Sequence, residues 1–161
     1  PAPDPTDLPL FHEWVLDVRG AGASSWIDRP PPVEMRIGEP PTFLGGAQVK
    51  GPRAHWMRAV RPTERDALNA VVLAYASDYL MLDMAFRAHP EPYVPGRFFG
   101  TSLDHSVCFH RPVRVDRWHR HTTELVALTG ERGLIHGTLH DQDGNLVASV
   151  SQEVLVRVTG S

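Results

Sequence analysis

The chain has 161 residues, a formal net charge of −3, and 42% hydrophobic and 22% charged residues. These values are ordinary for one globular domain, and the charge gives no electrostatic case for binding nucleic acid or an anionic membrane. The single cysteine, Cys108, excludes an intrachain disulfide framework and favours a reducing, cytoplasmic location. No apolar stretch is long enough for a membrane span, and the amino end lacks the pattern of a signal peptide.

Residues 1–52 are rich in proline and glycine and hold ten of the fifteen prolines. Because proline fixes φ and removes a hydrogen-bond donor, this segment is interpreted as an extended lead-in or linker. Within it, the alternation at 33–37 predicts a short strand. A single folded domain is then expected over residues 53–158.

The elements expected after residue 52 follow in a simple order. Residues 53–60 predict a strand, and a long helix is expected from about residue 64 to residue 87, where His89-Pro90 ends it. Residues 91–100 have the composition of a loop. Turn signals then separate four predicted strands: 101–110, 118–129, 132–140 and 145–158.

The stretch VVLAYASDYLMLDMAF at 71–86 is apolar on almost every face, so the helix must be enclosed. A single antiparallel sheet curled around the helix encloses it. The order of strand, helix and four-strand meander therefore predicts an α+β hotdog fold, with five or six antiparallel strands wrapped around one long central helix. A lone sheet covers only part of such a helix, so two units are expected to pair.

Two polar side chains interrupt the apolar pattern. Asp78 lies in the helix without a basic residue three or four positions away. It lies either on one solvated stripe of the helix or in a pocket as a general base. Gln152 falls in the apolar row of the last strand, where burial requires partners for both its carbonyl and its amide. It either makes a structural hydrogen bond to a loop or points at a polar group above the sheet.

Neither face of the strand expected at 101–110 is purely apolar, which indicates that one end borders a cavity or an interface. Nine histidines invite a metal hypothesis, but no zinc motif supplies the three or four converging ligands that zinc needs. No metal and no cofactor are therefore predicted. Cys108 is interpreted as a small buried hydrophobic residue.

Three separated motifs resemble the acyl-CoA thioesterase II family. They are LAYASDYLML at 73–82, SLDHSVCFHRP at 102–112 followed by Trp118, and DQDGNLVASVSQE at 141–153. Members of that family carry two hotdog units in one chain, and this sequence is similar to the C-terminal unit. The resemblance implies an acyl-CoA substrate and a partner, either an N-terminal unit or a second copy in a homodimer.

Carried over residue by residue, the resemblance implies Asp78, Gln152 and Ser102 as catalytic residues, with Ser102 standing where the family has threonine. Asp78 is then expected to act as a general base on water, in a dry apolar surround. Five residues are candidates for substrate binding, three for the acyl chain and two for the coenzyme A phosphates: Leu80, Met81, Met84, Arg111 and Arg114. Surface solvation is the alternative role of the two arginines.

Two other functions fit parts of the sequence. A non-catalytic hotdog half would complete a partner's acyl-CoA site or an oligomer interface, although the three candidate catalytic residues all stand in this half. An enoyl-CoA hydratase would need an Asp/His dyad near the helix start, whereas Asp104 and His105 lie on a predicted strand. Hydrolysis of acyl-CoA thioesters is therefore the favoured interpretation.

Overall fold

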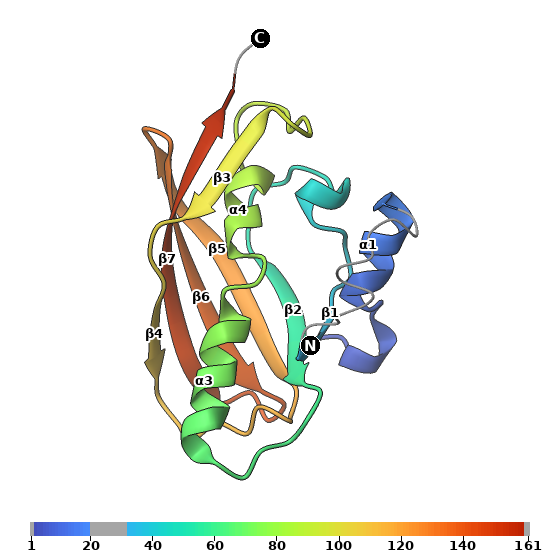
Figure 1. The fold of residues 1–161 in the computed structure, drawn as a ribbon, viewed down its shortest axis with the longest axis vertical. Coiled ribbons are helices and arrows are strands. Elements are labelled where there is room, and N and C mark those ends of the chain that lie inside the picture. Colours follow the sequence, from blue (N-terminus) through green and yellow to red (C-terminus); the bar gives the residue numbers. More distant parts are fainter. Residues whose placement is uncertain (1, 20–31, 160–161) are drawn as a thin grey trace.

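One antiparallel sheet dominates the computed structural model, which describes residues 2–19 and 32–159 (Figure 1). Its strands run in the order β1-β2-β5-β6-β7-β3, and β4 also pairs with β7. The bounds are β1 Val33–Arg36, β2 Arg53–Ala59, β3 Phe98–Ser102, β4 Ser106–Phe109, β5 His119–Thr129, β6 Arg132–Asp141 and β7 Leu146–Val158. Among the described helices, none is long and apolar enough to cross a bilayer.

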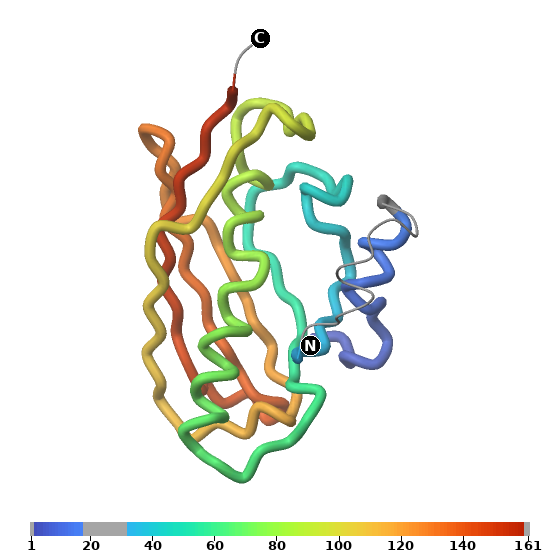
Figure 2. The backbone as a smooth tube through the Cα atoms, viewed as in Figure 1, coloured from blue at the N-terminus to red at the C-terminus, as the bar shows by residue number. Residues whose placement is uncertain are grey.

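Helices α3 (Asp66–Ser77) and α4 (Met81–Arg87) follow each other along one face of the sheet (Figure 2). This is the predicted hotdog arrangement, but it differs in two respects. The sheet has seven strands instead of the five or six expected, and the helix is interrupted. The single helix expected from residue 64 to residue 87 is broken at Asp78–Leu80, where Leu80 takes a left-handed backbone with φ of 66°. Such a conformation costs a non-glycine residue about 1–2 kcal/mol, and burial of the Leu80 side chain offsets that cost.

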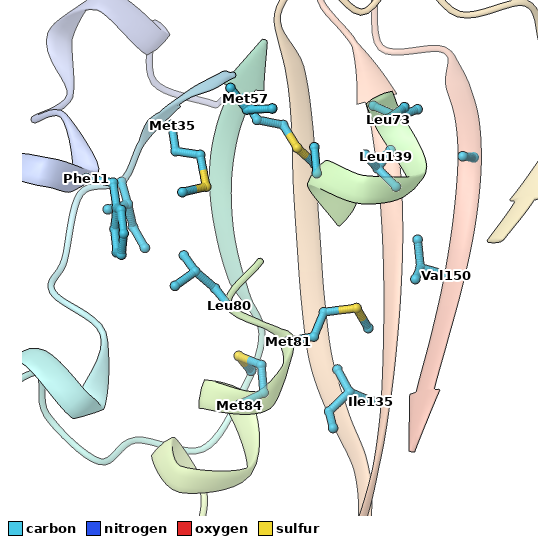
Figure 3. Close-up of a cluster of buried hydrophobic side chains, with 14 of the residues drawn as sticks. Phe11, Met35, Met57, Leu73, Leu80, Met81, Met84, Ile135, Leu139 and Val150 are labelled. Carbon is cyan, nitrogen blue, oxygen red and sulfur yellow. The ribbon is translucent and has the colours of Figure 1, made fainter. Parts of the chain in front are cut away.

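The hydrophobic core fills the space between the two helices and the sheet (Figure 3). Leu73 of α3 and Met81 of α4 are fully buried there, as are Ile135 and Leu139 of β6. On β7 every second side chain from Ala148 to Val156 is buried, which is the period-2 pattern of a strand with one face on the core.

Part of the proline-rich segment also contributes to the core. The strand expected at 33–37 is confirmed as β1, which pairs antiparallel with β2. Helix α1 (Phe11–Arg19) places Phe11 and Val15 among the buried residues, and Figure 3 shows Phe11 near Met35. The segment before residue 53 is therefore not uniformly extended, because its apolar side chains cover one end of the core. Its assignment as a lead-in stays a prediction, and the proline cluster at 30–31 lies outside the described residues.

The expectation that the helix is enclosed on every face is wrong for α3. Helix α4 is buried on most of its surface, but Leu68, Val71 and Tyr75 of α3 are exposed. Their spacing of three and four residues places them on one stripe of the helix. Figure 1 shows why: the sheet covers only one side of α3.

The second carboxylate of the apolar segment, Asp83, has a structural role. It is 1% exposed, pairs with the guanidinium of Arg53 at 2.5 Å, and accepts backbone N–H bonds from Thr42 and Phe43 at 3.1 and 3.3 Å. Removing one partner of a buried ion pair typically costs about 3–5 kcal/mol. Asp83 therefore connects α4 to β2 through Arg53, and to residues 42–43, which precede β2 in the sequence.

A buried histidine pair lies on the helix-facing side of β2 and β5. His55 and His121 are directly opposite in register, and their ring centroids are 5.1 Å apart. Among the described residues, all four of their ring nitrogens are buried without a hydrogen-bond partner. Desolvation, followed by the charge of Arg53, lowers the pKa of His55 to about 3. Desolvation, followed by neighbouring histidines, also lowers the pKa of His121 well below its ordinary value.

This pair predicts a loss of stability in acid. Both histidines are neutral in the folded chain and regain an ordinary pKa of about 6.5 when unfolded, so the unfolded state takes up more protons as the pH falls. Well above pH 6.5 the histidines do not lower the free energy of unfolding. Between about pH 7.5 and pH 5.5, each histidine lowers it by about 1.4 kcal/mol. Urea unfolding at the two pH values measures this loss.

The matched comparison is the double variant His55→Leu with His121→Leu against His136→Gln, which changes an exposed histidine. The double variant is expected to lose most of the acid dependence, and His136→Gln to keep it. An unchanged pH dependence in the double variant would contradict this assignment.

Candidate active site

Asp78 and Gln152 meet across the interface between the helices and the sheet. Asp78 lies at the C-terminal cap of α3, in the turn that separates it from α4. Gln152 lies on β7, is 0% exposed, and donates a short hydrogen bond from its side-chain amide nitrogen to Oδ1 of Asp78. Of the two interpretations of Gln152, the structure supports the second: it points at a polar group above the sheet.

The orientation of the Gln152 amide follows from its partner. An ionised carboxylate only accepts hydrogen bonds, so the NH₂ group of the amide must face Asp78. The carbonyl oxygen Oε1 then points elsewhere, and it is buried without a partner among the described residues. An unpaired buried acceptor is uncommon in folded proteins and marks this position as a candidate for function.

Ser102 lies on the same side of the sheet, at the end of β3. It is paired with Val154 in register, and directly opposite residues of an antiparallel pair share a face. Gly100, two residues earlier, faces α4 so closely that an added Cβ would lie 2.7 Å from the Phe86 ring. Ser102 is exposed, and among the described residues its hydroxyl makes no hydrogen bond to Asp78 or Gln152.

The strand expected at 101–110 is two strands with an irregular step between them. In β3 the register pairs Ser102 with Val154, whereas in β4 it pairs Val107 with Val150, so the chain gains one residue between them. At the step, the backbone N–H of Leu103 donates to Glu153 O at 2.8 Å, and Asp104 accepts the N–H of Glu153 at 2.7 Å. In one uninterrupted strand Ser102 and His105 would lie on opposite faces, whereas the extra residue allows both to lie on the face toward the helices.

His105 completes the polar cluster. Its Nδ1 lies 3.3 Å from the amide nitrogen of Gln152 and 3.9 Å from Oδ1 of Asp78, and its Nε2 lies 2.9 Å from the hydroxyl of Ser77. The Ser77 hydroxyl in turn donates to the Ala74 carbonyl at 2.9 Å. The site is thus a chain of hydrogen bonds that runs from α3 through the step between β3 and β4 to β7.

The dry surround expected for Asp78 is absent from this single unit. The Asp78 side chain is 56% exposed, and it continues the exposed stripe of α3 that holds Leu68, Val71 and Tyr75. The interpretation of Asp78 on a solvated stripe therefore describes its position here, while its contact with buried Gln152 distinguishes it from an ordinary surface carboxylate.

The candidates for substrate binding occupy two different environments. Leu80, Met81 and Met84 are buried in the core between α4 and the sheet (Figure 3), so their contact with an acyl chain stays a prediction. Arg111 is exposed in the connection after β4, and Arg114 is bonded to Asp116 at 3.3 Å on the surface. Surface solvation accounts for both arginines as they stand, and their contact with coenzyme A also stays a prediction.

Two further expectations concern metal and cysteine. Within the described part of the chain, no group of three or more histidine, cysteine, aspartate or glutamate side chains is arranged to hold a metal ion. Cys108 is exposed rather than buried, because β4 is an edge strand and its odd-numbered and even-numbered side chains face opposite sides.

Sequence reasoning missed the role of His105 and Ser77. The period-2 pattern of the strand expected at 101–110 cannot reveal the step between β3 and β4, so it gives no partner for His105. Ser77 directly precedes Asp78 in the sequence. A helix interior that contains adjacent serine and aspartate is the one signal that pointed toward a polar centre here.

A curled antiparallel sheet around two successive helices, with a polar cluster where the helix breaks, defines a hotdog protein with a candidate catalytic centre. The family model described as the acyl-CoA thioesterase C-terminal domain matches residues 3–156. The chain therefore belongs to this family, and the resemblance drawn from its three motifs is confirmed.

Curated relatives and a solved structure agree with this assignment. The chain is 36% identical to mouse acyl-coenzyme A thioesterase 8 over 168 residues, which covers 97% of this chain and 52% of the relative. It is 31% identical to acyl-CoA thioesterase 2 of Haemophilus influenzae, covering 78% of this chain and 44% of that one. A crystal structure of an acyl-CoA thioesterase II, TesB2, from Mycobacterium marinum superposes with a TM-score of 0.72 at 29% identity, covering 99% of this chain and 56% of that chain. The chain thus spans about half the length of these proteins.

Proposed function

We propose that this chain hydrolyses acyl-CoA thioesters, with Asp78 as the general base and Gln152 and Ser102 as residues that orient the attacking water. The observation that carries the proposal is the hydrogen bond between buried Gln152 and Asp78. The named activity of the relatives, acyl-CoA thioesterase, gives the substrate class. The single cysteine supports work in a reducing compartment such as the cytoplasm.

The polar groups suit activation of a water molecule. A water that donates one hydrogen to Asp78 and the other to the free Oε1 of Gln152 directs its lone pair away from both residues, toward the thioester carbonyl. Attack forms the new C–O bond while Asp78 takes the proton. The C–S bond then breaks, its electron pair leaves with the coenzyme A thiolate, and Asp78 returns the proton to the thiolate or to solvent. General base catalysis of this kind typically contributes about 10²- to 10⁴-fold.

Ser102 has a supporting role in this proposal. Ser102 lies opposite Val154 of β7, two residues from Gln152, so the two side chains share one face of the sheet. Ser102 is also exposed, so a substrate can reach it. A hydroxyl both donates and accepts, so it can hold the water or the thioester carbonyl oxygen. Serine lacks the methyl group that stiffens the threonine side chain, so its contribution is expected to be the smallest of the three.

The hydratase alternative loses its main support in the geometry. The Asp104 carboxylate is engaged by the backbone N–H of Glu153, and His105 is bonded to Ser77 and Gln152. The two residues therefore serve different neighbours and do not act as a dyad. The non-catalytic half keeps one observation in its favour, the 56% exposure of Asp78, which leaves the base in water until something covers it.

That exposure leads to the second element of the proposal: a second hotdog unit packs over α3. The relatives are about twice as long as this chain, and the stripe of Leu68, Val71 and Tyr75 that ends at Asp78 is apolar and exposed. Covering this stripe would bury apolar surface and remove water from Asp78 at the same time. The second unit is either another copy of this chain or an N-terminal unit of the same family.

The hydrolysis proposal predicts a large loss on removing the base. Asp78→Asn keeps the shape of the side chain but removes its basicity, and release of free thiol from a medium-chain acyl-CoA is expected to fall by about 10²-fold or more. Ser102→Ala is expected to cost less than about tenfold. Asp66→Asn, which alters an exposed carboxylate in the first turn of the same helix, is the control and is expected to keep parental activity.

Three results would contradict the proposal. They are an Asp78→Asn variant as active as Asp66→Asn, a loss of activity that tracks a loss of folded protein in circular dichroism, and an inactive parent that stays inactive when an N-terminal hotdog unit is supplied. The last of these would favour the non-catalytic half.

Pairing through α3 predicts a change in assembly. Tyr75→Asp introduces a charge into the exposed apolar stripe, so the dimer fraction measured by light scattering at micromolar concentration is expected to fall. Val126→Asp changes a similarly exposed residue on β5 and is expected to leave the dimer intact. A parental chain that is monomeric in this experiment would contradict pairing with itself.

A further inference from the structure

We infer that His105 is a positioning residue for the reaction: as the neutral Nε2–H tautomer, it holds the Gln152 amide against Asp78 and leaves the Gln152 carbonyl oxygen free for the attacking water. The inference rests on the proposed hydrolysis. It assigns His105 no contact with substrate. Consecutive hydrogen bonds connect the Ala74 carbonyl to Ser77, Ser77 to His105, His105 to Gln152, and Gln152 to Asp78.

The contact at Nδ1 determines the tautomer. Nδ1 of His105 lies 3.3 Å from the amide nitrogen of Gln152, whose NH₂ group is fixed as a donor by the carboxylate of Asp78. Two donors cannot share a hydrogen bond, so Nδ1 must carry its lone pair and accept. The single ring proton of the neutral imidazole is then on Nε2.

The contact at Nε2 leads to the same assignment independently. The Ser77 hydroxyl donates to the Ala74 carbonyl at 2.9 Å, and the same oxygen lies 2.9 Å from Nε2 of His105. With its proton on Ala74, the hydroxyl oxygen accepts from the ring, which requires Nε2–H. Ser77 is fully buried and belongs to α3, so it anchors the ring to the helix that presents Asp78.

The network has a consequence for Gln152. Its two amide hydrogens go to Asp78 and His105, which leaves Oε1 as the part of the side chain without a partner among the described residues. Without His105, one N–H of a fully buried amide would be unpaired, which is unfavourable for a buried donor. The hydrogen bond to Asp78 would then hold the amide from one side, and Oε1 would be positioned less precisely for the water.

Protonation of His105 would break the same arrangement. An imidazolium donates from both nitrogens, so Nδ1–H would face the Gln152 NH₂ group and compete for Asp78, whose Oδ1 lies 3.9 Å away. The titratable groups that face the ring are Asp78 from the turn after α3 and His121 from β5, which stays neutral through burial. Only the neutral ring, which accepts at Nδ1, can hold the Gln152 amide in this arrangement.

The test combines one spectroscopic and one kinetic measurement on the whole chain. In ¹⁵N-histidine-labelled protein, the His105 ring is expected to show a protonated Nε2 and an unprotonated Nδ1. His105→Ala is expected to lower kcat by about 10- to 100-fold, with KM within about threefold because the ring touches no substrate. His105→Asn places an oxygen near the position of Nδ1, where it can accept from the Gln152 amide, and it is expected to recover much of the loss.

The matched control is His110→Asn. His110 follows the same strand, and its Nε2 lies 2.9 Å from the hydroxyl of Ser149, on the exposed face away from Asp78. It reproduces the histidine–serine pair without the link to Gln152, so this variant is expected to keep the parental kcat.

Several results would overturn the inference. They are an Nδ1–H tautomer at His105, a His105→Ala variant that matches His110→Asn in kcat, and a change confined to KM. A different result would overturn the proposed function itself: hydrolysis that survives Asp78→Asn. The two failures are therefore distinguishable, because an active parent that is sensitive to Asp78→Asn and insensitive to His105→Ala contradicts only the role of His105.

Discussion

The buried amide of Gln152 imposes the constraint on which the rest of this site depends. A fully buried side-chain amide must find acceptors for its N–H groups, or the fold carries a cost of about 1–3 kcal/mol for each group left unpaired. Here the acceptors are a carboxylate at a helix break and a ring nitrogen on a neighbouring strand segment. Because these partners use both donors, the orientation of the amide is fixed, and its oxygen is left without a partner among the described residues.

Two local irregularities of the backbone place Asp78 and His105 next to Gln152. The break at Asp78–Leu80 ends α3 beside the sheet, and a left-handed residue, Leu80, then restarts the chain as α4. The step between β3 and β4 adds one residue, which turns both Ser102 and His105 toward the helices. Irregular backbone of this kind is common near functional sites. The ion pair between Asp83 and Arg53 holds α4 against β2.

Much of this could be predicted from the sequence, for physical reasons. Apolar periodicity gave the helix segment and the strands β5, β6 and β7 to within about two residues, because burial of one face dominates their patterns. The same reasoning singled out Asp78 and Gln152, since polar groups in apolar rows require a partner. It failed at the helix break and at the step beside Asp104, because both depend on tertiary contacts. Burial of Leu80 and the hydrogen bonds to Glu153 are not encoded in any local periodicity.

The two carboxylates of the central segment, Asp83 and Asp78, differ in their burial and in their partners. Asp83 is 1% exposed and fully engaged by a cation and two backbone N–H groups. Asp78 is largely exposed, at the end of an apolar stripe, and among the described residues the Gln152 amide is its side-chain partner within hydrogen-bond distance. A carboxylate that Gln152 contacts on one side and that is exposed on the other is consistent with the proposed role of Asp78 as a base at a site covered by a second unit.

The central claim is that Asp78 and Gln152 act as one unit on the attacking water. The most direct test is a double-mutant cycle on kcat/KM for thioester hydrolysis, with Asp78→Asn, Gln152→Leu and the two combined. Groups that act together give strongly non-additive losses, so the double variant is expected to be no worse than Asp78→Asn alone within about twofold. Losses that multiply would show that the two residues act independently and would contradict this account.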